Sequence, residues 1–309
     1  MFKFTVKRIL LMIPSVIVIT LLTFLIMANS SGSPGAIALG IKAKPEDIAA
    51  YNHEIGYDRP VMVRYGEYLW NLCHGDLGTS YKNSKVSVTT TVMSKFPITL
   101  NLAIWAVFFS ALIGIPLGVL AAVKKGSVWD TGTTVLSLIL ASLPGFWFAL
   151  LLMLLFSLRL GWLPSFGLGS WKHYVMPLIT LALPSSAYIA RMVRITMIQE
   201  LNSDYVRTAR AKGASPMRII FVHVLRNALM PVITTLGMSF AGLLGGAVVC
   251  EQVFGLPGVG QAILNAINSK DAPIVMGATV ILSLLYMVIM LVMDLLNALL
   301  NPKIRDNMG

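Results

Sequence analysis

Residues 203–216 read Ser-Asp-Tyr-Val-Arg-Thr-Ala-Arg-Ala-Lys-Gly-Ala-Ser-Pro, a polar stretch between two apolar stretches. Ser203 or Asp204 can cap a short helix, and Gly213 can end that helix in the left-handed conformation. Ser215 and Pro216 supply the N-cap and the first-turn proline of a second helix. The first helix is basic and rich in small residues, whereas the second is apolar enough to fold back against a larger body. The sequence therefore predicts a bent lever arm that docks onto another protein.

The composition indicates a membrane protein. Of the 309 residues, 56% are hydrophobic and 12% are charged, which is far from the balance of soluble domains. A span of the bilayer core needs about 20 helical residues. Six stretches are long enough: 9–28, 100–123, 133–158, 175–190, 229–250 and 274–296. We predict an all-α integral membrane protein with six transmembrane helices, in which the fourth can continue past Arg191 as an amphipathic helix.

The positions of Lys and Arg predict the orientation. The first apolar stretch is too long for a signal peptide and is expected to remain as an anchor. Short cytoplasmic loops are enriched in Lys and Arg. These residues gather before residue 9, at Lys124 and Lys125, between residues 191 and 226, and at the end of the chain. We therefore expect both termini to be cytoplasmic and residues 29–98 to be extracytoplasmic. The net charge of +11 reflects this bias, and no nucleic-acid binding is expected.

Several motifs carry a resemblance to a known family. The strings 205–213 (Tyr-Val-Arg-Thr-Ala-Arg-Ala-Lys-Gly) and 223–231 (His-Val-Leu-Arg-Asn-Ala-Leu-Met-Pro) are similar to the cytoplasmic coupling loop of ABC importer permeases. Residues 75–80, 113–119, 160–164 and 251–260 resemble further motifs in the same order. The match is to the first of the two permeases in dipeptide, oligopeptide and nickel importers. Arg207-Thr208 replaces the Glu-Ala of the general family pattern, as is usual in this branch.

The resemblance implies a type I importer-like permease fold in the bacterial inner membrane. It divides the chain into an anchor helix (1–28), an extracytoplasmic segment (29–98), a five-helix permease core (99–300) with a coupling loop near 200–228, and a cytoplasmic tail (301–309). It also implies a second homologous permease, two ABC ATPases and an extracytoplasmic substrate-binding protein. The residues expected to contact an ATPase are Asp204, Tyr205, Arg207, Thr208, Ala209, Arg210, Lys212, Gly213, Ser215 and Pro216.

A second candidate region is the loop before the last apolar stretch. Gly255, Pro257, Gly258 and Gly260 predict a tight structured turn. The resemblance places this loop on the external side, where substrate is delivered. The candidates for contact there are Glu251, Phe254, Pro257, Gly258 and Asp271, and the two acids are expected either to meet a binding protein or a substrate amine, or to serve the turn.

The chain lacks the motifs of an energy source or an enzyme. It contains no Gly-Lys dipeptide, so a phosphate-binding loop ending in Gly-Lys-Ser/Thr is excluded. We expect no cofactor in this chain, with ATP and Mg bound by partner ATPases. No catalytic or metal site is predicted, although Cys73-His74 is a weak metal candidate. Cys73 and Cys250 can form a disulfide, but two unpaired thiols are favoured.

The substrate class and the coupling mode leave alternatives. The resemblance favours di- or oligopeptides, with nickel, a nickel chelate or a glutathione-like peptide as the second choice. Asp294 is the candidate for a proton-coupled carrier, because such carriers place ionisable groups inside the membrane. Its other interpretation is a carboxylate near the cytoplasmic interface that faces Lys303, Arg305 or a neighbouring helix. A passive pore is the remaining alternative.

Overall fold

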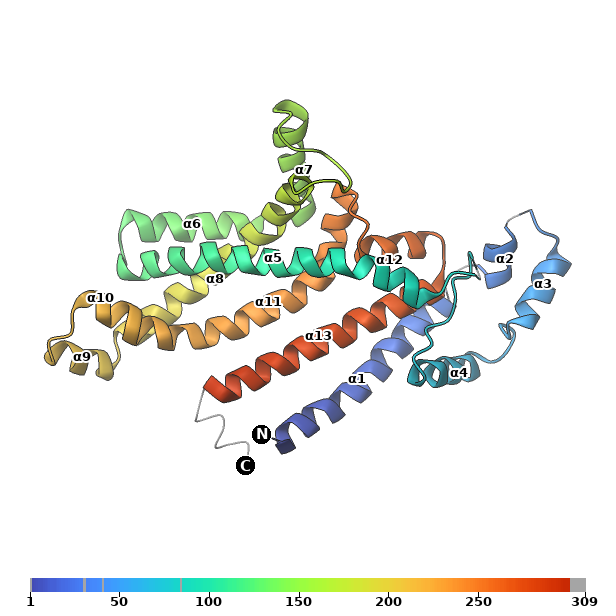
Figure 1. Cartoon of the computed structure of the whole chain (residues 1–309), viewed down its shortest axis with the longest axis horizontal. Coiled ribbons are helices and arrows are strands. Elements are labelled where there is room, and N and C mark those ends of the chain that lie inside the picture. The colour runs from blue at the N-terminus through green and yellow to red at the C-terminus, as the bar shows by residue number, and fades with distance from the viewer. Residues whose placement is uncertain (1, 30–31, 41, 84, 301–309) are drawn as a thin grey trace.

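The computed structural model describes residues 2–29, 32–40, 42–83 and 85–300, and these are almost entirely helical (Figure 1). Within this part of the chain, the β pairing is a single antiparallel bridge between Thr79 and Ser87. The proposed tail, 301–309, lies outside the described residues. The prediction of an all-α protein is confirmed.

Five long helices form the body of the molecule (Figure 1). They are α1 (Phe2–Ala28), α5 (Val88–Val123), α8 (Lys172–Leu201), α11 (Leu225–Phe254) and α13 (Ala272–Leu300). In the described residues, five helical spans are long and apolar enough to cross a membrane, and counting two sharply bent helix pairs raises this to seven. The predicted number of six transmembrane helices lies between these two counts.

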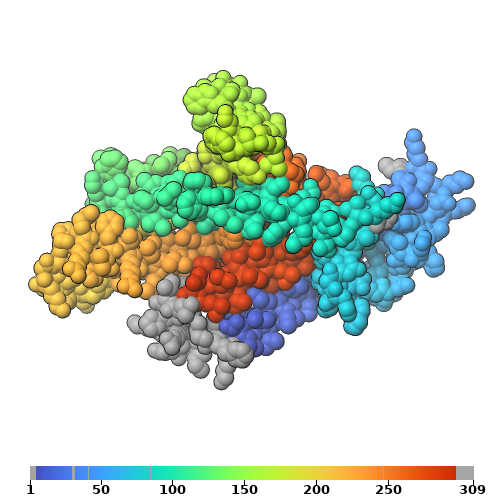
Figure 2. Space-filling view, in the orientation of Figure 1, coloured from blue at the N-terminus to red at the C-terminus, as the bar shows by residue number. Residues whose placement is uncertain are grey.

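The predicted span 133–158 is not one continuous helix. It is broken into α6 (Val128–Ser142) and α7 (Gly145–Leu152), which continues as the π-helical segment η1 (Met153–Arg159). The two arms meet at an angle of 101°. Leu143 precedes a proline and is therefore extended, with ψ at 126°, because a helical residue there would clash with the proline ring. As a result the arm formed by α7, η1 and the loop after it projects from the side of the body (Figures 1 and 2), while Ala149 and Leu152 of α7 are buried in the core.

Other boundaries also differ from the prediction. Helix α5 begins at Val88, well before the predicted residue 100, and α8 continues past Arg191 to Leu201 as expected. Helix α11 extends beyond residue 250 and ends at Phe254, followed by a turn through Gly255 and then α12 (Val259–Asn268), bent by 80° from the end of α11. The predicted tight turn is present, and a further helix that the sequence analysis did not anticipate follows it.

The segment between α1 and α5 contains three short helices: α2 (Pro34–Leu39), α3 (Pro45–Glu54) and α4 (Val61–Cys73). Pro45 occupies the first turn of α3. Helix α4 is attached to α1 by the Tyr65 hydroxyl, which donates to the Ile17 carbonyl at 2.9 Å. Burial raises the pKa of the neighbouring Tyr68 to about 12. The segment is therefore a folded unit fixed to the first helix.

The closest helix contact in the body joins α5 to α8. A Cβ atom placed on Gly114 would lie 2.6 Å from the Ser186 carbonyl oxygen, and one on Gly118 would lie 2.5 Å from that of Ala190. On the same side of α5, the Ser110 hydroxyl lies 3.0 Å from the Ala182 carbonyl oxygen, to which it donates. Small residues at this spacing let two helix backbones approach closely. Such close packing matters in a membrane, because lipid is as apolar as the side chains and the hydrophobic effect gives little driving force for helix association.

This contact generates a prediction about stability. The substitution Gly118→Ala forces the backbones of α5 and α8 apart and is expected to cost about 1 to 3 kcal/mol, the usual range for overpacking. Gly132→Ala on α6 is the matched control, because nothing lies within 4 Å of its Cβ position. Thermal unfolding of the two variants in the same detergent measures the difference. Equal midpoints would contradict the close approach.

Candidate functional site

The polar segment after α8 forms two short helices, as predicted. They are α9 (Asp204–Ala211) and α10 (Pro216–Arg218), which continues as the π-helical turn η2 (Ile219–Val224). Gly213 separates them with φ at +80°, a left-handed conformation that favours glycine. The Ser215 hydroxyl accepts from the Arg218 amide at 3.4 Å, and Pro216 occupies the first turn. The predicted helix end and second helix start are confirmed.

The cap of the first helix differs from the prediction. Ser203 occupies the N-cap position but makes no side-chain cap, because its hydroxyl donates to the Glu200 carbonyl at 2.6 Å. Asp204 lies in the first turn of α9 and pairs with Arg207 at 3.7 Å. Both side chains are exposed, so this pair contributes little stability.

Helix α9 presents a charged and small-residue surface to solvent. The exposed members of the predicted set are Asp204, Arg207, Thr208, Arg210, Lys212, Gly213, Ser215 and Pro216, and the partly buried members are Tyr205 and Ala209. Most of the predicted set therefore lies together on an accessible protrusion at one end of the molecule (Figure 1).

The opposite face of α9 is fixed to the membrane helices. Val206 is fully buried in an apolar cluster with Val193 and Met197 of α8 and Val224 of η2. Burying a valine contributes about 1.5 to 3 kcal/mol. The Tyr205 hydroxyl donates to the Glu200 carboxylate at 2.6 Å, and burial together with this bond raises the pKa of Tyr205 above its ordinary value. Helix α9 is therefore attached to α8 on one side and exposed on the other.

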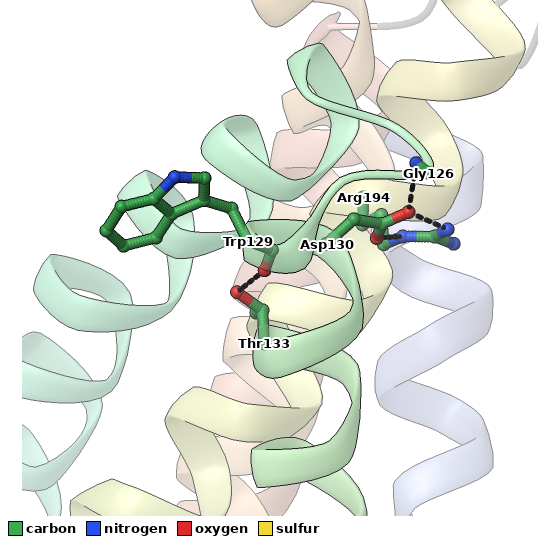
Figure 3. Close-up of polar contacts among 5 residues, drawn as sticks. All are labelled: Gly126, Trp129, Asp130, Thr133 and Arg194. Carbon is green, nitrogen blue, oxygen red and sulfur yellow. Dashed lines mark hydrogen bonds and ion pairs between the residues drawn. The ribbon is translucent and has the colours of Figure 1, made fainter.

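A buried ion pair braces the end of α8 that leads to α9 (Figure 3). Arg194 of α8 donates through both Nε and Nη2 to the Asp130 carboxylate of α6, the second bond measuring 2.9 Å. The Gly126 amide also donates to Asp130, at 2.9 Å. The side-chain exposure is 6% for Asp130 and 28% for Arg194. The two parallel bonds fix geometry as well as charge.

Sequence reasoning missed this pair. Arg194 counted only as one of the positive charges near the membrane, and Asp130 was not singled out. The available signal was an acid in the first turn of an apolar helix directly after Lys124 and Lys125, because a buried carboxylate needs a partner. The sequence alone gave no means of choosing Arg194 as that partner.

The outer-loop candidates lie in a buried polar network. Glu251 is fully buried and accepts from the Thr99 hydroxyl at 2.6 Å and from the Gln261 amide at 3.0 Å. Thr99 in turn accepts from the Val259 amide at 2.9 Å. A Cβ atom on Gly258 would lie 2.2 Å from the Glu251 carboxyl carbon, so only glycine fits there. Glu251 thus joins α5, α11 and the start of α12.

Asp271 is buried in the same way. It accepts from the Ser80 hydroxyl and from the Tyr81 amide, the latter at 3.0 Å, and its side chain is shielded from solvent. Phe254 is also buried, and Pro257 is partly buried. Of the two alternatives given for Glu251 and Asp271, these contacts fit a role in the turn, because protein groups donate to both carboxylates and both side chains are buried.

The remaining titratable candidates have ordinary partners. Asp294 pairs with Arg8 of the neighbouring helix α1 at 3.1 Å, whereas Lys303 and Arg305 lie outside the described residues. Cys73 and Cys250 are both free thiols, as favoured. His74, the other half of the weak metal candidate, has its Nδ1 at 2.8 Å from the Trp70 carbonyl oxygen. No cluster of three or more His, Cys, Asp or Glu that could hold a metal ion occurs among the described residues.

The Asp130–Arg194 pair generates a second prediction. Removing one partner leaves a poorly solvated charge, which in buried pairs typically costs 3 to 5 kcal/mol; the partial exposure of Arg194 lowers our expectation to about 2 to 3 kcal/mol. Asp130→Ala, Arg194→Ala and the double variant form a cycle in which thermal stability is measured. The stability lost in the double variant is expected to be smaller than the sum of the losses in the two single variants. Arg191→Ala, an exposed arginine on the same helix, is the control, and strict additivity would refute the pairing.

Comparisons with known proteins agree with the fold. The family described as binding-protein-dependent transport system inner membrane component matches residues 114–306, and the family that describes the N-terminal part of this membrane component matches residues 1–103. A putative peptide transport system permease protein of Brucella abortus (strain 2308) is 39% identical over 307 residues, covering 97% of this chain and 98% of that protein. The di/tripeptide transport system permease protein DppB of Pseudomonas aeruginosa (strain UCBPP-PA14) is 37% identical and covers 99% of both chains.

A solved structure shares the same fold. The inward-facing MetNI methionine ABC transporter contains a chain that superposes with a TM-score of 0.59 at 21% identity, covering 69% of this chain and 97% of that chain. At this identity the likeness concerns the fold only. The sequence matches, in contrast, extend over nearly the whole length. The chain therefore belongs to the family of binding-protein-dependent transport system inner membrane components, the permease subunits of ABC importers.

Proposed function

We propose that this chain is the first of two homologous permeases in an ATP-driven importer of di- and oligopeptides in the bacterial inner membrane. The observation that carries the proposal is the attachment of α9. Its exposed face is basic, and its buried face is fixed through Val206 and Tyr205 to α8 and η2. A partner that moves α9 therefore also moves the long helix α8.

The proposed orientation places α9, both chain termini and the 124–127 loop on the cytoplasmic side. The Gly126–Asp130–Arg194 contacts support it, because they bring Lys124 and Lys125 to the same end of the molecule as α9. One end thus collects the positive loops, as expected for a cytoplasmic face. Residues 29–98 and α12 then lie on the extracytoplasmic side.

The proposed partners follow from the way ABC importers distribute ATP hydrolysis, transport and solute binding over separate subunits. Two ABC ATPases bind ATP and Mg and receive α9 in a groove. Arg207, Arg210 and Lys212 offer charge-assisted contacts to acidic residues there. When the ATPases close, α9 tilts the attached helices and alternates access to a pathway shared with the second permease. An extracytoplasmic protein binds the solute and delivers it.

Peptides are the proposed substrate because the relatives from Brucella abortus and Pseudomonas aeruginosa are named as peptide and di/tripeptide permeases. Nickel, a nickel chelate or a glutathione-like peptide is the alternative within this class. A proton-coupled carrier is disfavoured, because the carboxylate of Asp294 is already paired with Arg8 at 3.1 Å.

The assembly and its substrate are tested together. The tagged protein is purified from its native membrane, its partners are identified by mass spectrometry, and any recovered binding protein is titrated calorimetrically with peptides and with nickel. We expect a second permease, ATPases and a binding protein that takes peptides. Nickel binding without peptide binding would replace the substrate. A chain that purifies alone and still transports would overturn the proposal.

The lever is tested at Gly213. Gly213→Val places a branched residue at φ +80°, where even an ordinary side chain costs about 1 to 2 kcal/mol, and the turn between α9 and α10 must change. We expect normal membrane insertion and ATP hydrolysis that no longer drives uptake. Gly75→Val is the matched control, because Gly75 has the same φ and equally open surroundings in the 29–98 segment. Transport by Gly213→Val at the level of the control would refute the lever mechanism.

A further inference from the structure

An open groove of about 880 Å³ lies beside α12. One wall is the turn around Lys82 and Asn83, the second is the first turns of α5 with Lys95, and the third is α12 with Asn265 and Asn268. The groove is wide and open, and most of its lining residues carry polar or charged side chains, in contrast to the apolar surface that the long helices present. We call it the lysine groove.

The charge of the lysine groove is positive and unbalanced. Asp271 is the acid among the described residues that line it, and this carboxylate is buried and accepts from Ser80 and Tyr81. Lys82 and Lys95 line the groove, and the exposed Lys85 lies on the same turn as Lys82. The ion pairs found among the described residues include none of these three lysines. Lys95 also lies near the buried Glu251 carboxylate, so the cations available to an acidic ligand are those of Lys82 and Lys85.

The walls of the groove are fixed relative to the membrane helices. Asp271, directly before α13, holds the turn at Ser80 and Tyr81. On the opposite side, Thr99 bonds to Glu251 of α11 and to the first amide of α12. A partner that docks here meets a preformed surface and loses little free energy in ordering it. It also contacts α12, whose first turn is bonded to both α5 and α11.

We propose that the lysine groove is the docking surface for an acidic face of the extracytoplasmic substrate-binding protein. The inference rests on the proposed function, which supplies that partner and that orientation. Lysines attract acidic side chains over a distance and speed encounter, while the three asparagines supply hydrogen bonds that set the orientation. Because the groove is open rather than enclosed, it suits the edge of a folded protein. Docking would act on α12 and, through Thr99 and Glu251, on α5 and α11.

The test uses the assembled importer in lipid nanodiscs and its purified binding protein. The charge-reversed variant Lys82→Glu/Lys85→Glu changes two exposed lysines and leaves Lys95, close to the Glu251 network, intact. Lys42→Glu/Lys44→Glu is the matched control, since it reverses two exposed lysines elsewhere in the same segment. The dissociation constant is measured at low and at high salt, together with ATP hydrolysis in the absence of the binding protein.

We expect the groove variant to bind at least about tenfold more weakly at low salt, a difference of about 1.4 kcal/mol, and to lose most of its salt dependence. The control variant should bind as the native importer does, and hydrolysis without binding protein should be unchanged in both. Equal affinities for the native and groove variants would overturn the inference. The inference would also be overturned if the native importer and the control variant bound a free peptide directly and the groove variant did not. The groove would then be a peptide site. If the native importer binds no such protein, the proposed function fails instead.

Discussion

The close contact between α5 and α8 is the constraint on which the rest of the structure depends. Gly114 and Gly118 let the two backbones meet in the last third of α5. In lipid such small-residue contacts replace much of the burial that would hold soluble helices together. The same two helices carry the polar anchors at both ends, because Thr99 lies on α5 and Arg194 lies on α8. The pair therefore forms a continuous spine between the two ends of the molecule.

Buried carboxylates fasten other elements to this spine. Asp130 joins α6 and the preceding loop to α8, whereas Glu251 joins α11 and α12 to α5. Asp271 holds the turn that precedes α5. A buried carboxylate without donors would be costly, so each depends on the arrangement that it stabilises. These carboxylates fix the relative positions of the helices at both ends of the molecule, and each accepts hydrogen bonds from groups of the protein itself.

This arrangement accounts for how a permease can link events on two sides of a membrane without chemistry of its own. At one end α9 is exposed on one face and fixed through Val206 on the other. At the opposite end α12 borders an open positive groove and is bonded at its first turn to α5 and α11. Movement imposed at either end therefore reaches helices that run the length of the body. The bend at Leu143 turns α7 away from the direction of α6, and Ala149 and Leu152 of α7 are buried in the same core cluster as residues of α5, α8 and α11.

The sequence by itself determined the membrane class, the positions of most long helices and the bend at Gly213 with its following Ser215-Pro216 start, because hydrophobicity, left-handed glycine and first-turn proline act locally. The tertiary structure decided the partners of the acids. Glu251 meets a threonine 152 positions away, and Asp130 meets an arginine 64 positions away. It also decided that the outer acids are buried. The reason is that a side chain's environment depends on distant segments, which no local pattern specifies.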